Sequence, residues 1–360
     1  MKKLIFCPLL VFACLCACRS EKTNRSPEEV TCLELPVNSS SILMYNSNYL
    51  TDSLLYFYDV ENRGDILACR IAKDGVVVMD TVKTPTIAPY YEMFVLAYDS
   101  IASISHKPFR TMTLTHNDGT AIGIHSIESR GPYVNDISQQ PRHGNTVYFA
   151  NTDDSIAQSG VLRSEFYRAV KPVYEYDLAS GTGKSWGVFP NALATALGFE
   201  ETPTICVAND TSVVLSFMCV DSLYLYVNGE LKSRHCCRSR YIGHFPEYDT
   251  AKVFDLGYYR QFTQSRPEYL NLLHNPTKQC FYRIALHEDS PKGRMRPNTP
   301  SKRTWSVMVI NKDLEVVSEH LFRFTEYYPF VIAPDFRGLW VGKTPESETD
   351  TIRKISLLEL

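Results

Sequence analysis

The 360-residue chain lacks the charge imbalance and the short motifs that would assign it to a common functional class. Its 37 basic and 40 acidic residues give a formal net charge of −3, which excludes the strongly basic surface of a nucleic-acid-binding protein. It has neither the Gly-x-Gly-x-x-Gly dinucleotide pattern nor a phosphate-binding loop. No segment predicts the strand–turn–helix setting that a hydrolase nucleophile needs. We therefore predict no cofactor and name no catalytic residue.

Long apolar runs are also absent, apart from one near the N-terminus. This run extends from Leu4 to Leu15 without a charged residue and follows Met1-Lys2-Lys3. It is shorter than the roughly 20 residues that span a bilayer. A positive start and a short apolar run are typical of a secretory signal, so we predict that residues 1–17 are a cleaved signal peptide.

The end of this signal, Leu15-Cys16-Ala17-Cys18, resembles the lipobox of bacterial lipoprotein precursors. The resemblance implies lipidation of Cys18, with palmitate-like acyl chains that hold the protein at a membrane. A weaker lipobox ends at Cys14, and an ordinary cleaved signal is a further alternative. No Asp follows Cys18 to indicate inner-membrane retention, which favours the outer membrane and leaves open whether the protein faces the periplasm or the exterior.

Of the eleven cysteines, four belong to the signal and the anchor position, which weakens the case for a disulfide framework. A domain of this size does not need disulfides. One disulfide among the other seven is compatible with the sequence, but spacing does not define its partners. We expect most of the seven to be buried as small hydrophobic side chains. They are Cys32, Cys69, Cys206, Cys219, Cys236, Cys237 and Cys280.

One group of residues suggests a metal site, namely His235-Cys236-Cys237 with His244 nearby. Zinc ligands usually occur in pairs of the Cys-x-x-Cys type. Adjacent cysteines on a strand point to opposite faces and would not share one ion, so we predict no metal.

Residues 18–30 are polar and predict a flexible tether, and residues 31–360 predict a single β domain. Aromatic residues make up 12 % of the chain, and short apolar runs end repeatedly at Gly, Asn, Asp or Pro. Five predicted hairpins join Ile66–Ala72 to Val76–Val82, Arg110–Thr115 to Thr120–Ile127, Val173–Tyr176 to Lys184–Phe189, Leu223–Tyr226 to Glu230–Cys236, and Trp305–Ile310 to Leu314–Phe322. Further predicted strands are Leu54–Val60, Phe94–Ser103, Thr146–Ala150, Thr204–Ala208, Val213–Val220, Gln279–Leu286, Leu339–Gly342 and Ile352–Leu360. Asn191–Leu197 and Pro267–Leu273 are candidate short helices.

Hairpins of one style that recur along a chain favour an all-β propeller, in which neighbouring sheets cover one another's faces. At about 45–50 residues per blade, the chain accommodates six or seven blades. A β-sandwich or two smaller β domains are the alternatives. We expect the C-terminal strand, Ile352–Leu360, to complete a blade beside a strand near Ser41–Tyr45.

A family resemblance is carried by the segment Tyr269-Leu270-Asn271-Leu272-Leu273-His274-Asn275-Pro276-Thr277-Lys278-Gln279-Cys280-Phe281-Tyr282-Arg283. Together with the Lys-Lys signal, the lipobox and the Tyr-rich hairpins, it resembles the uncharacterised Bacteroidetes lipoproteins of domain-of-unknown-function family 4221. The resemblance implies a propeller of the six-bladed TolB-like type, and it implies no activity.

The Phe281-Tyr282-Arg283 ending occurs twice more in similar form, as Phe166-Tyr167-Arg168 and Tyr258-Tyr259-Arg260. Arginines and tyrosines at inner strand ends would line a channel and bind a carboxylate or a sugar. On that interpretation Arg168, Arg260, Tyr282 and Arg283 are candidate ligand-binding residues. The alternative, which we favour, is that these side chains pack between blades.

These observations predict a membrane-anchored binding or scaffolding propeller of the cell envelope, with an envelope protein or a glycan as its ligand. The loops at one mouth of the propeller are the expected contact surface. The alternative function is an envelope enzyme that acts on a polysaccharide or a peptide there, and a sensory partner of an envelope complex is a third. An enzyme would need two acids brought together by the fold, and the sequence does not single out a pair among Glu165, Glu175, Asp210, Asp221 and Asp335.

Overall fold

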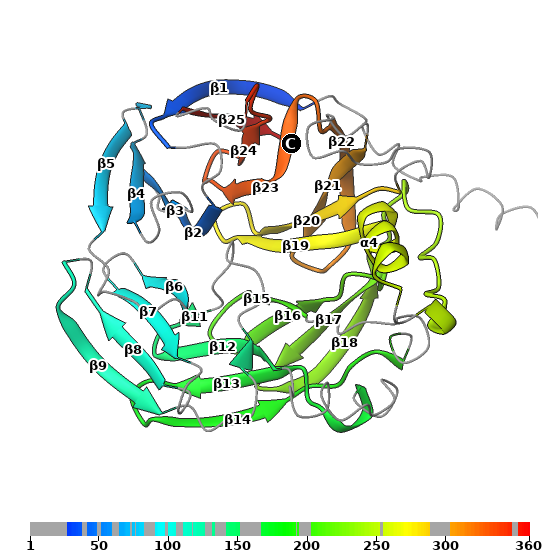
Figure 1. Cartoon of the computed structure of the whole chain (residues 1–360), viewed down its shortest axis with the longest axis horizontal. Coiled ribbons are helices and arrows are strands. Elements are labelled where there is room, and N and C mark those ends of the chain that lie inside the picture. The colour runs from blue at the N-terminus through cyan, green and yellow to red at the C-terminus, as the bar shows by residue number, and fades with distance from the viewer. Residues whose placement is uncertain are drawn as a thin grey trace, which may run out of the picture.

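In the computed structural model of the chain, the described residues form six antiparallel sheets that follow one another around a ring (Figure 1). The predicted all-β propeller is therefore confirmed. The structure describes residues 27–37, 42–48, 52–59, 65–72, 74–75, 77–82, 91–97, 100–105, 111–116, 118–126, 132–133, 142–151, 167–191, 193, 203–252, 255–288, 303–347 and 352–360.

The first three sheets come from the N-terminal half of the chain. The first contains β2 (Ile42–Asn48), β3 (Asp52–Asp59), β4 (Asp65–Ala72) and β5 (Val77–Val82). The second contains β6 (Tyr91–Ala97), β7 (Ser100–Ser105), β8 (Thr111–Thr115) and β9 (Ala121–Ser126). The third contains β10 (Pro132–Tyr133), β12 (Thr146–Asn151), β13 (Val173–Asp177) and β14 (Thr182–Trp186), with β11 (Arg142–His143) paired to β12.

The other three sheets come from the C-terminal half, with one strand borrowed from the N-terminus. The fourth contains β15 (Thr204–Val207), β16 (Ser212–Ser216), β17 (Ser222–Val227) and β18 (Glu230–Cys236). The fifth contains β19 (Glu268–Asn275), β20 (Cys280–Leu286), β21 (Thr304–Asn311) and β22 (Val316–Arg323). The sixth contains β23 (Tyr327–Pro334), β24 (Leu339–Lys343), β25 (Arg353–Glu359) and β1 (Glu28–Leu35).

The predicted hairpins form where the turn residues favour them. Gly75 and Gly229 have φ angles of 85° and 81° between their paired strands. Residues other than glycine rarely adopt such angles, so the Asp-Gly and Asn-Gly turns fix these hairpins locally.

The C-terminal strand completes the sixth sheet, but beside a different partner from the one predicted. β25 pairs with β1 from Arg353 opposite Leu35 to Glu359 opposite Glu28, and β2, which overlaps the predicted Ser41–Tyr45 strand, pairs with β3 instead. β1 also begins at Glu28, within the segment predicted as a tether. The alternation of exposed and half-buried side chains along β1 explains how this polar segment serves as an outer strand.

Two other predictions are corrected by the structure. The predicted single strand Phe94–Ser103 is divided between β6 and β7, which pair with each other. The predicted helix Pro267–Leu273 is strand β19, and its helix-like apolar spacing has a different origin. A register shift between Tyr269 and Leu272 brings both side chains and that of Leu273 into the core, as a β-bulge does.

A helix that the sequence pattern did not predict lies just before this strand. Helix α4 (Leu256–Ser265) is capped by Asp255, whose Oδ1 accepts a hydrogen bond from Tyr258 N at 3.0 Å. It ends before Arg266-Pro267, because a proline disfavours helical geometry in the residue that precedes it. Most of the predicted helix Asn191–Leu197 lies outside the described residues.

The hydrophobic core is divided into clusters, each of which lies between two neighbouring sheets. Trp305 and Ile284 of the fifth sheet pack with Leu339 and Val341 of the sixth, for example. Met112 of the second sheet packs in the same way against Phe149 of the third. Each sheet therefore depends on its neighbours for burial of its apolar faces.

The cysteines behave largely as predicted. All seven after the anchor position are free, and five of them are buried. Cys32 and Cys236 are exposed, on the outer strands β1 and β18. Among the described residues, no helix is long and apolar enough to span a bilayer.

Candidate functional site

The connection between β18 and β19, residues 237–267, is a long insertion that carries helix α4 and is rich in aromatic and basic residues. We call it the β18–β19 insertion. It lies on the outer side of the ring in Figure 1. Loops of this length in a compact domain are usually functional, which makes the insertion a candidate site.

The insertion is held in shape by its own aromatic side chains. The ring of Tyr248 lies 5.2 Å from that of Tyr258 and 5.0 Å from that of Phe262, between centroids. The ammonium group of Lys252 lies 4.6 Å from the centroid of the Tyr258 ring. These contacts fasten α4 to the loop before it.

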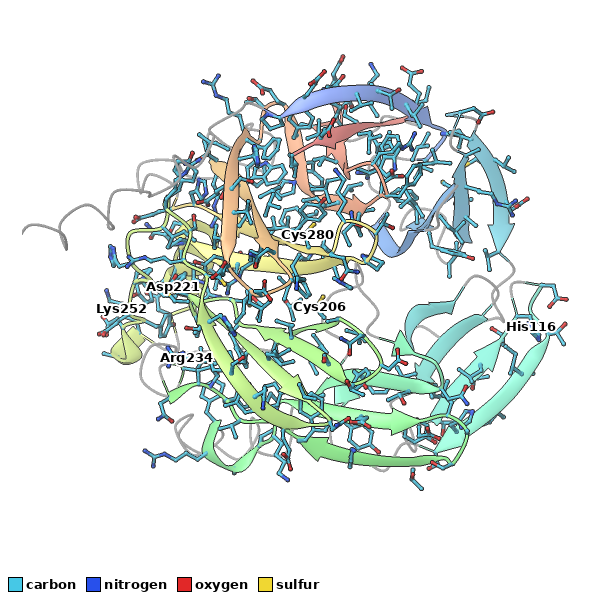
Figure 2. The ribbon with its side chains drawn as sticks, turned by 180° about the vertical axis from the view of Figure 1, so that it is seen from behind. His116, Cys206, Asp221, Arg234, Lys252 and Cys280 are labelled. Carbon is cyan, nitrogen blue, oxygen red and sulfur yellow. The ribbon has the colours of Figure 1, made fainter. Side chains whose placement is uncertain are left out.

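Beneath the insertion, a group of polar and charged side chains joins the insertion to the fifth sheet. We call it the charged cluster. Its members come from the insertion and from β19 to β22 and are Ser239, Arg240, Arg266, Glu268, His287, Arg303, Thr304, Ser306 and Glu319. Asp221, Arg234 of β18 and Lys252 of the insertion lie on one side of the ring in Figure 2.

Glu319 on β22 is the centre of one half of the charged cluster. Its Oε1 accepts hydrogen bonds from Ser239 Oγ at 2.5 Å and from Ser306 Oγ at 2.7 Å. Its Oε2 accepts one from Arg240 N at 2.9 Å, and Arg240 Nη2 donates to the Glu319 carbonyl. This buried carboxylate therefore ties the start of the insertion to the fifth sheet.

His287, directly after β20, continues this network. Ser306 gives its only hydroxyl hydrogen to Glu319, so its oxygen accepts from His287 Nε2, 2.9 Å away. His287 Nδ1 then accepts from Thr304 Oγ1 at 2.9 Å. Burial, with a smaller contribution from Arg303, lowers the pKa of His287 to about 4, so the ring is neutral at neutral pH. The ring of Tyr241, itself 37 % exposed, lies 5.0 Å from that of His287.

Arg266 and Glu268 form the other half of the charged cluster. Arg266 Nε lies 3.5 Å from Glu268 Oε2, and both side chains are largely buried. Burial raises the pKa of Glu268, and the positive charges of Arg266 and Arg303 oppose this rise. Arg266 Nε and Nη1 are enclosed and have no hydrogen-bond acceptor. Enclosed donors without acceptors are rare in folded proteins.

The predicted ligand-binding residues do not come together. Arg283 is fully buried in β20, and its guanidinium donates to Ser216 Oγ and to the carbonyls of Phe217, Val220, Asp221 and Cys237. It also lies over the ring of Tyr269, at 3.4 Å from the centroid. These contacts place the Arg283 guanidinium between the fourth and fifth sheets.

The other three candidates are placed in three different settings. Tyr282 is 2 % exposed on β20, beside Asn275 Nδ2. Arg168 is exposed and follows the buried Tyr167. Arg260 lies within helix α4, not at a strand end, and its side chain is outside the described residues. Among the three of these four side chains that the structure describes, Tyr282 and Arg283 are thus the two buried ones.

The carboxylates considered for catalysis have separate roles. Glu175 accepts from Trp186 Nε1 at 2.8 Å, and Asp221 accepts from Tyr269 OH at 2.7 Å. Asp335 is fully buried and accepts from Arg337 and from Trp340 Nε1. Asp210 is exposed, and Glu165 lies outside the described residues. Glu175, Asp221 and Asp335 lie in three different sheets or at their ends, so the fold does not bring these carboxylates together as a pair.

Two short patterns in the sequence resemble sites, and the structure explains both. Gly183-Lys184-Ser185-Trp186-Gly187 has the Gly-x-Ser-x-Gly spacing of a nucleophile elbow, yet residues 182–186 form strand β14. In the His235-Cys236-Cys237 segment, Cys236 is exposed and Cys237 is buried, as expected for alternating side chains. Within the described part of the chain, no group of three or more His, Cys, Asp or Glu has the arrangement of a metal site.

No pattern in the sequence by itself indicated the charged cluster. A partial signal was present, because residues 237–267 combine tyrosines, phenylalanines and arginines without strand alternation. Only the pairing of β20, β21 and β22 brings His287, Arg303, Ser306 and Glu319 close together.

No protein-family model and no curated protein matches the chain. Among solved structures, a DUF4221-family protein from Bacteroides vulgatus matches with a TM-score of 0.73 over 94 % of this chain and 99 % of that one. The chain has the fold of this DUF4221 protein. Their sequence identity is 15 %, so the match establishes the fold, and the predicted resemblance is confirmed at that level.

Other solved structures are less similar to this DUF4221-like propeller. A protein of unknown function from Bacteroides caccae has a TM-score of 0.42 at 10 % identity, over 81 % of this chain and 85 % of its own. BamB from Moraxella catarrhalis has a TM-score of 0.36 at 6 % identity, over 92 % of this chain and 99 % of its own.

Proposed function

We propose that the protein is a lipid-anchored propeller of the cell envelope that binds a partner through the β18–β19 insertion. The observation that carries this proposal is the position of β1, which is the outermost strand of its sheet and begins ten residues after Cys18. Ten extended residues span at most about 35 Å. An anchor at Cys18 would therefore hold the rim of the ring close to the membrane.

This attachment suits a binding or scaffolding role. Because β1 is at the rim, a tether there leaves both faces of the ring unobstructed. Because β1 pairs with β25 along its length, the anchored end of the chain is also part of the ring closure. Lys343 Nζ and Tyr327 OH both contact Glu29 Oε2, at 2.5 and 2.9 Å, and fasten β1 to the same sheet. A pull on the tether is thus transmitted to a closed ring.

The β18–β19 insertion is the surface that we assign to the partner, an envelope protein or a glycan. Exposed Arg240 and Tyr241 lie together there, with the Arg240 guanidinium 4.9 Å from the Tyr241 ring centroid. Arginine and tyrosine are enriched where proteins make their strongest contacts. We place the anchored protein in the outer membrane, since no Asp follows Cys18.

The anchor is tested by metabolic labelling with a palmitate analogue and by membrane fractionation. We expect Cys18→Ala to abolish the label and to release the protein from the membrane fraction, and we expect Cys14→Ala to change neither. A label that persists in Cys18→Ala and disappears in Cys14→Ala would contradict the assignment.

The binding surface is tested by photo-crosslinking in intact cells. A photoreactive amino acid at position 241 should give one dominant adduct, which free glycan or purified partner competes away. The matched control is position 124, because Ile124 is 72 % exposed on β9, in the second sheet. Equal adducts at positions 241 and 124, or none at 241, would contradict the proposed surface. A glycan array with the same protein separates glycan from protein partners.

A further inference from the structure

Strand β18 is the outermost strand of the fourth sheet, and the sequence that begins on it is basic. The segment from Leu231 to His244 contains four lysines or arginines and no Asp or Glu, in a chain whose net charge is −3. Residues 232, 234, 236, 238 and 240 are exposed, and the residues between them are buried or half-buried. The exposed cations therefore follow the alternation of an extended chain. They are Lys232, Arg234, Arg238 and Arg240, and we call them the basic row.

Two cations of the basic row have carboxylate partners. Arg238 Nε lies 3.7 Å from Asp221 Oδ2, and Arg240 Nε lies 3.8 Å from Glu319 Oε2. The side chains of Arg238 and Arg240 are still 51 % and 38 % exposed. These two charges are partly balanced, and solvent reaches both of them.

The other two cations, Lys232 and Arg234, belong to β18 itself. Arg234 Nε donates to Ser222 Oγ at 2.9 Å, and this hydroxyl carries no charge. Within the described part of the chain, neither Lys232 nor Arg234 forms an ion pair. Figure 2 shows Arg234 at the outer side of the ring. The unbalanced positive charge of the basic row thus lies on the outer strand.

The edge of β18 that faces away from β17 is open to a further strand. No described strand pairs with this edge, and none of the hydrogen bonds in the described turns and loops involves the backbone of residues 230–236. Such an edge can receive a strand of another protein through backbone hydrogen bonds. Charged side chains along an edge discourage pairing with most strands. The basic row therefore selects for a strand of opposite charge.

Alternate residues of an extended chain lie about 7 Å apart, so acids at alternate positions of an added strand have the same spacing as the cations of β18. Opposite charges directly across two paired strands stabilise the pairing, and like charges destabilise it. The basic row also continues into Arg240 and Tyr241 of the proposed binding surface. Resting on the proposed binding function, we propose that the edge of β18 receives an extended acidic segment of a partner protein, with alternate Asp or Glu side chains opposite Lys232 and Arg234.

The experiment uses the full-length lipidated protein in detergent and measures the fluorescence anisotropy of a labelled peptide, Thr-Glu-Val-Glu-Val-Glu-Thr, at low salt. Three peptides serve as ligand controls. One has Gln in place of Glu, one has the same composition with the three Glu adjacent, and one is N-methylated at its five central residues. We expect each control to bind about tenfold more weakly or not at all, because it lacks the charge, the alternation or the backbone donors. Dextran sulfate is the probe for a polyanion without a peptide backbone.

The protein variant is Lys232→Gln combined with Arg234→Gln. The matched control is Lys184→Gln, which removes an exposed cation from β14, the outer strand of the third sheet. We expect the double variant to bind the acidic peptide about fivefold more weakly, since two opposite-charge pairs are lost, and the control to bind it as the native protein does. If circular dichroism shows that the double variant does not fold, the three control peptides decide.

Three results would overturn the inference: no binding of the acidic peptide, equal binding of its N-methylated form, or unchanged affinity in the double variant. Tighter binding of dextran sulfate than of the peptide would also overturn it and would indicate an anionic glycan. If the peptide does not bind but the adduct at position 241 persists, the partner chemistry is wrong and the proposed function stands. If the adduct is also absent, the proposed function is wrong as well.

Discussion

Replacing Arg283 by Met removes a buried cation that holds the fourth and fifth sheets together. In the native protein its guanidinium donates to Val220 O at 2.6 Å, Cys237 O at 2.9 Å and Asp221 O at 3.0 Å. Ser216 Oγ and Phe217 O accept longer hydrogen bonds, of 3.1 and 3.4 Å. The variant leaves all five acceptors without this donor, and four of the five hydrogen bonds that it removes are buried.

Two opposing contributions determine how much Arg283→Met changes the free energy of unfolding. Each hydrogen bond from a charged group contributes about 1.5–3 kcal/mol to stability, whereas loss of the charge removes a desolvation cost of several kcal/mol. The backbone carbonyls cannot turn toward solvent, because strands and turns hold them in place. We therefore expect the loss to dominate, with a decrease of about 4 kcal/mol in the free energy of unfolding, as is typical when one partner of a buried polar pair is removed.

The assay is urea denaturation followed by circular dichroism at neutral pH. Arg283→Lys should recover part of the loss, because an ammonium has fewer donors and no fork. The control is Arg234→Met on β18, where the guanidinium is exposed and donates to Ser222 Oγ. It should change stability by less than about 1 kcal/mol. A decrease of less than about 1 kcal/mol in Arg283→Met, with an unchanged denaturant slope, would refute the argument that Arg283 joins the two sheets.

Two further predictions follow from pKa values that burial shifts. The pKa of His287 falls from 6.5 to about 4 on folding, so the unfolded chain binds the additional proton between these values and the protein loses about 3 kcal/mol of stability as the pH falls from 6.5 to 4. His287→Gln should reduce this loss of stability at low pH, as measured by urea denaturation at several pH values. An unchanged loss would contradict its attribution to His287. Burial raises the pKa of Cys69 and Cys206 to about 12, so iodoacetamide should label exposed Cys32 and Cys236 first. Mass spectrometry of the native protein tests this order, and labelling of Cys206 as fast as of Cys32 would contradict it.

The sequence alone determined the features that depend on neighbouring residues. A glycine with positive φ after Asp or Asn, between two apolar runs, defines a hairpin whatever surrounds it. The hairpins at Gly75 and Gly229 were predictable for this reason, and their repetition was sufficient to predict a propeller. The exposed Cys236 and buried Cys237 likewise follow from strand alternation.

Features that depend on distant residues required the tertiary structure. The strand that receives β25 lies more than three hundred residues away along the chain, and its polar sequence resembles that of a tether. The bulge in β19 gives Tyr269, Leu272 and Leu273 a helical spacing, and only pairing with β20 reveals the strand.

The repeated tyrosine–arginine triplet illustrates the same limit. Its three copies are alike in sequence, yet Arg283 is buried in a strand, Arg260 belongs to a helix and Arg168 is exposed. A guanidinium takes its role from the acceptors around it, and these come from other sheets. Sequence determined which hairpins form, and only the packing of one sheet on the next decided that Arg283 joins the fourth and fifth sheets.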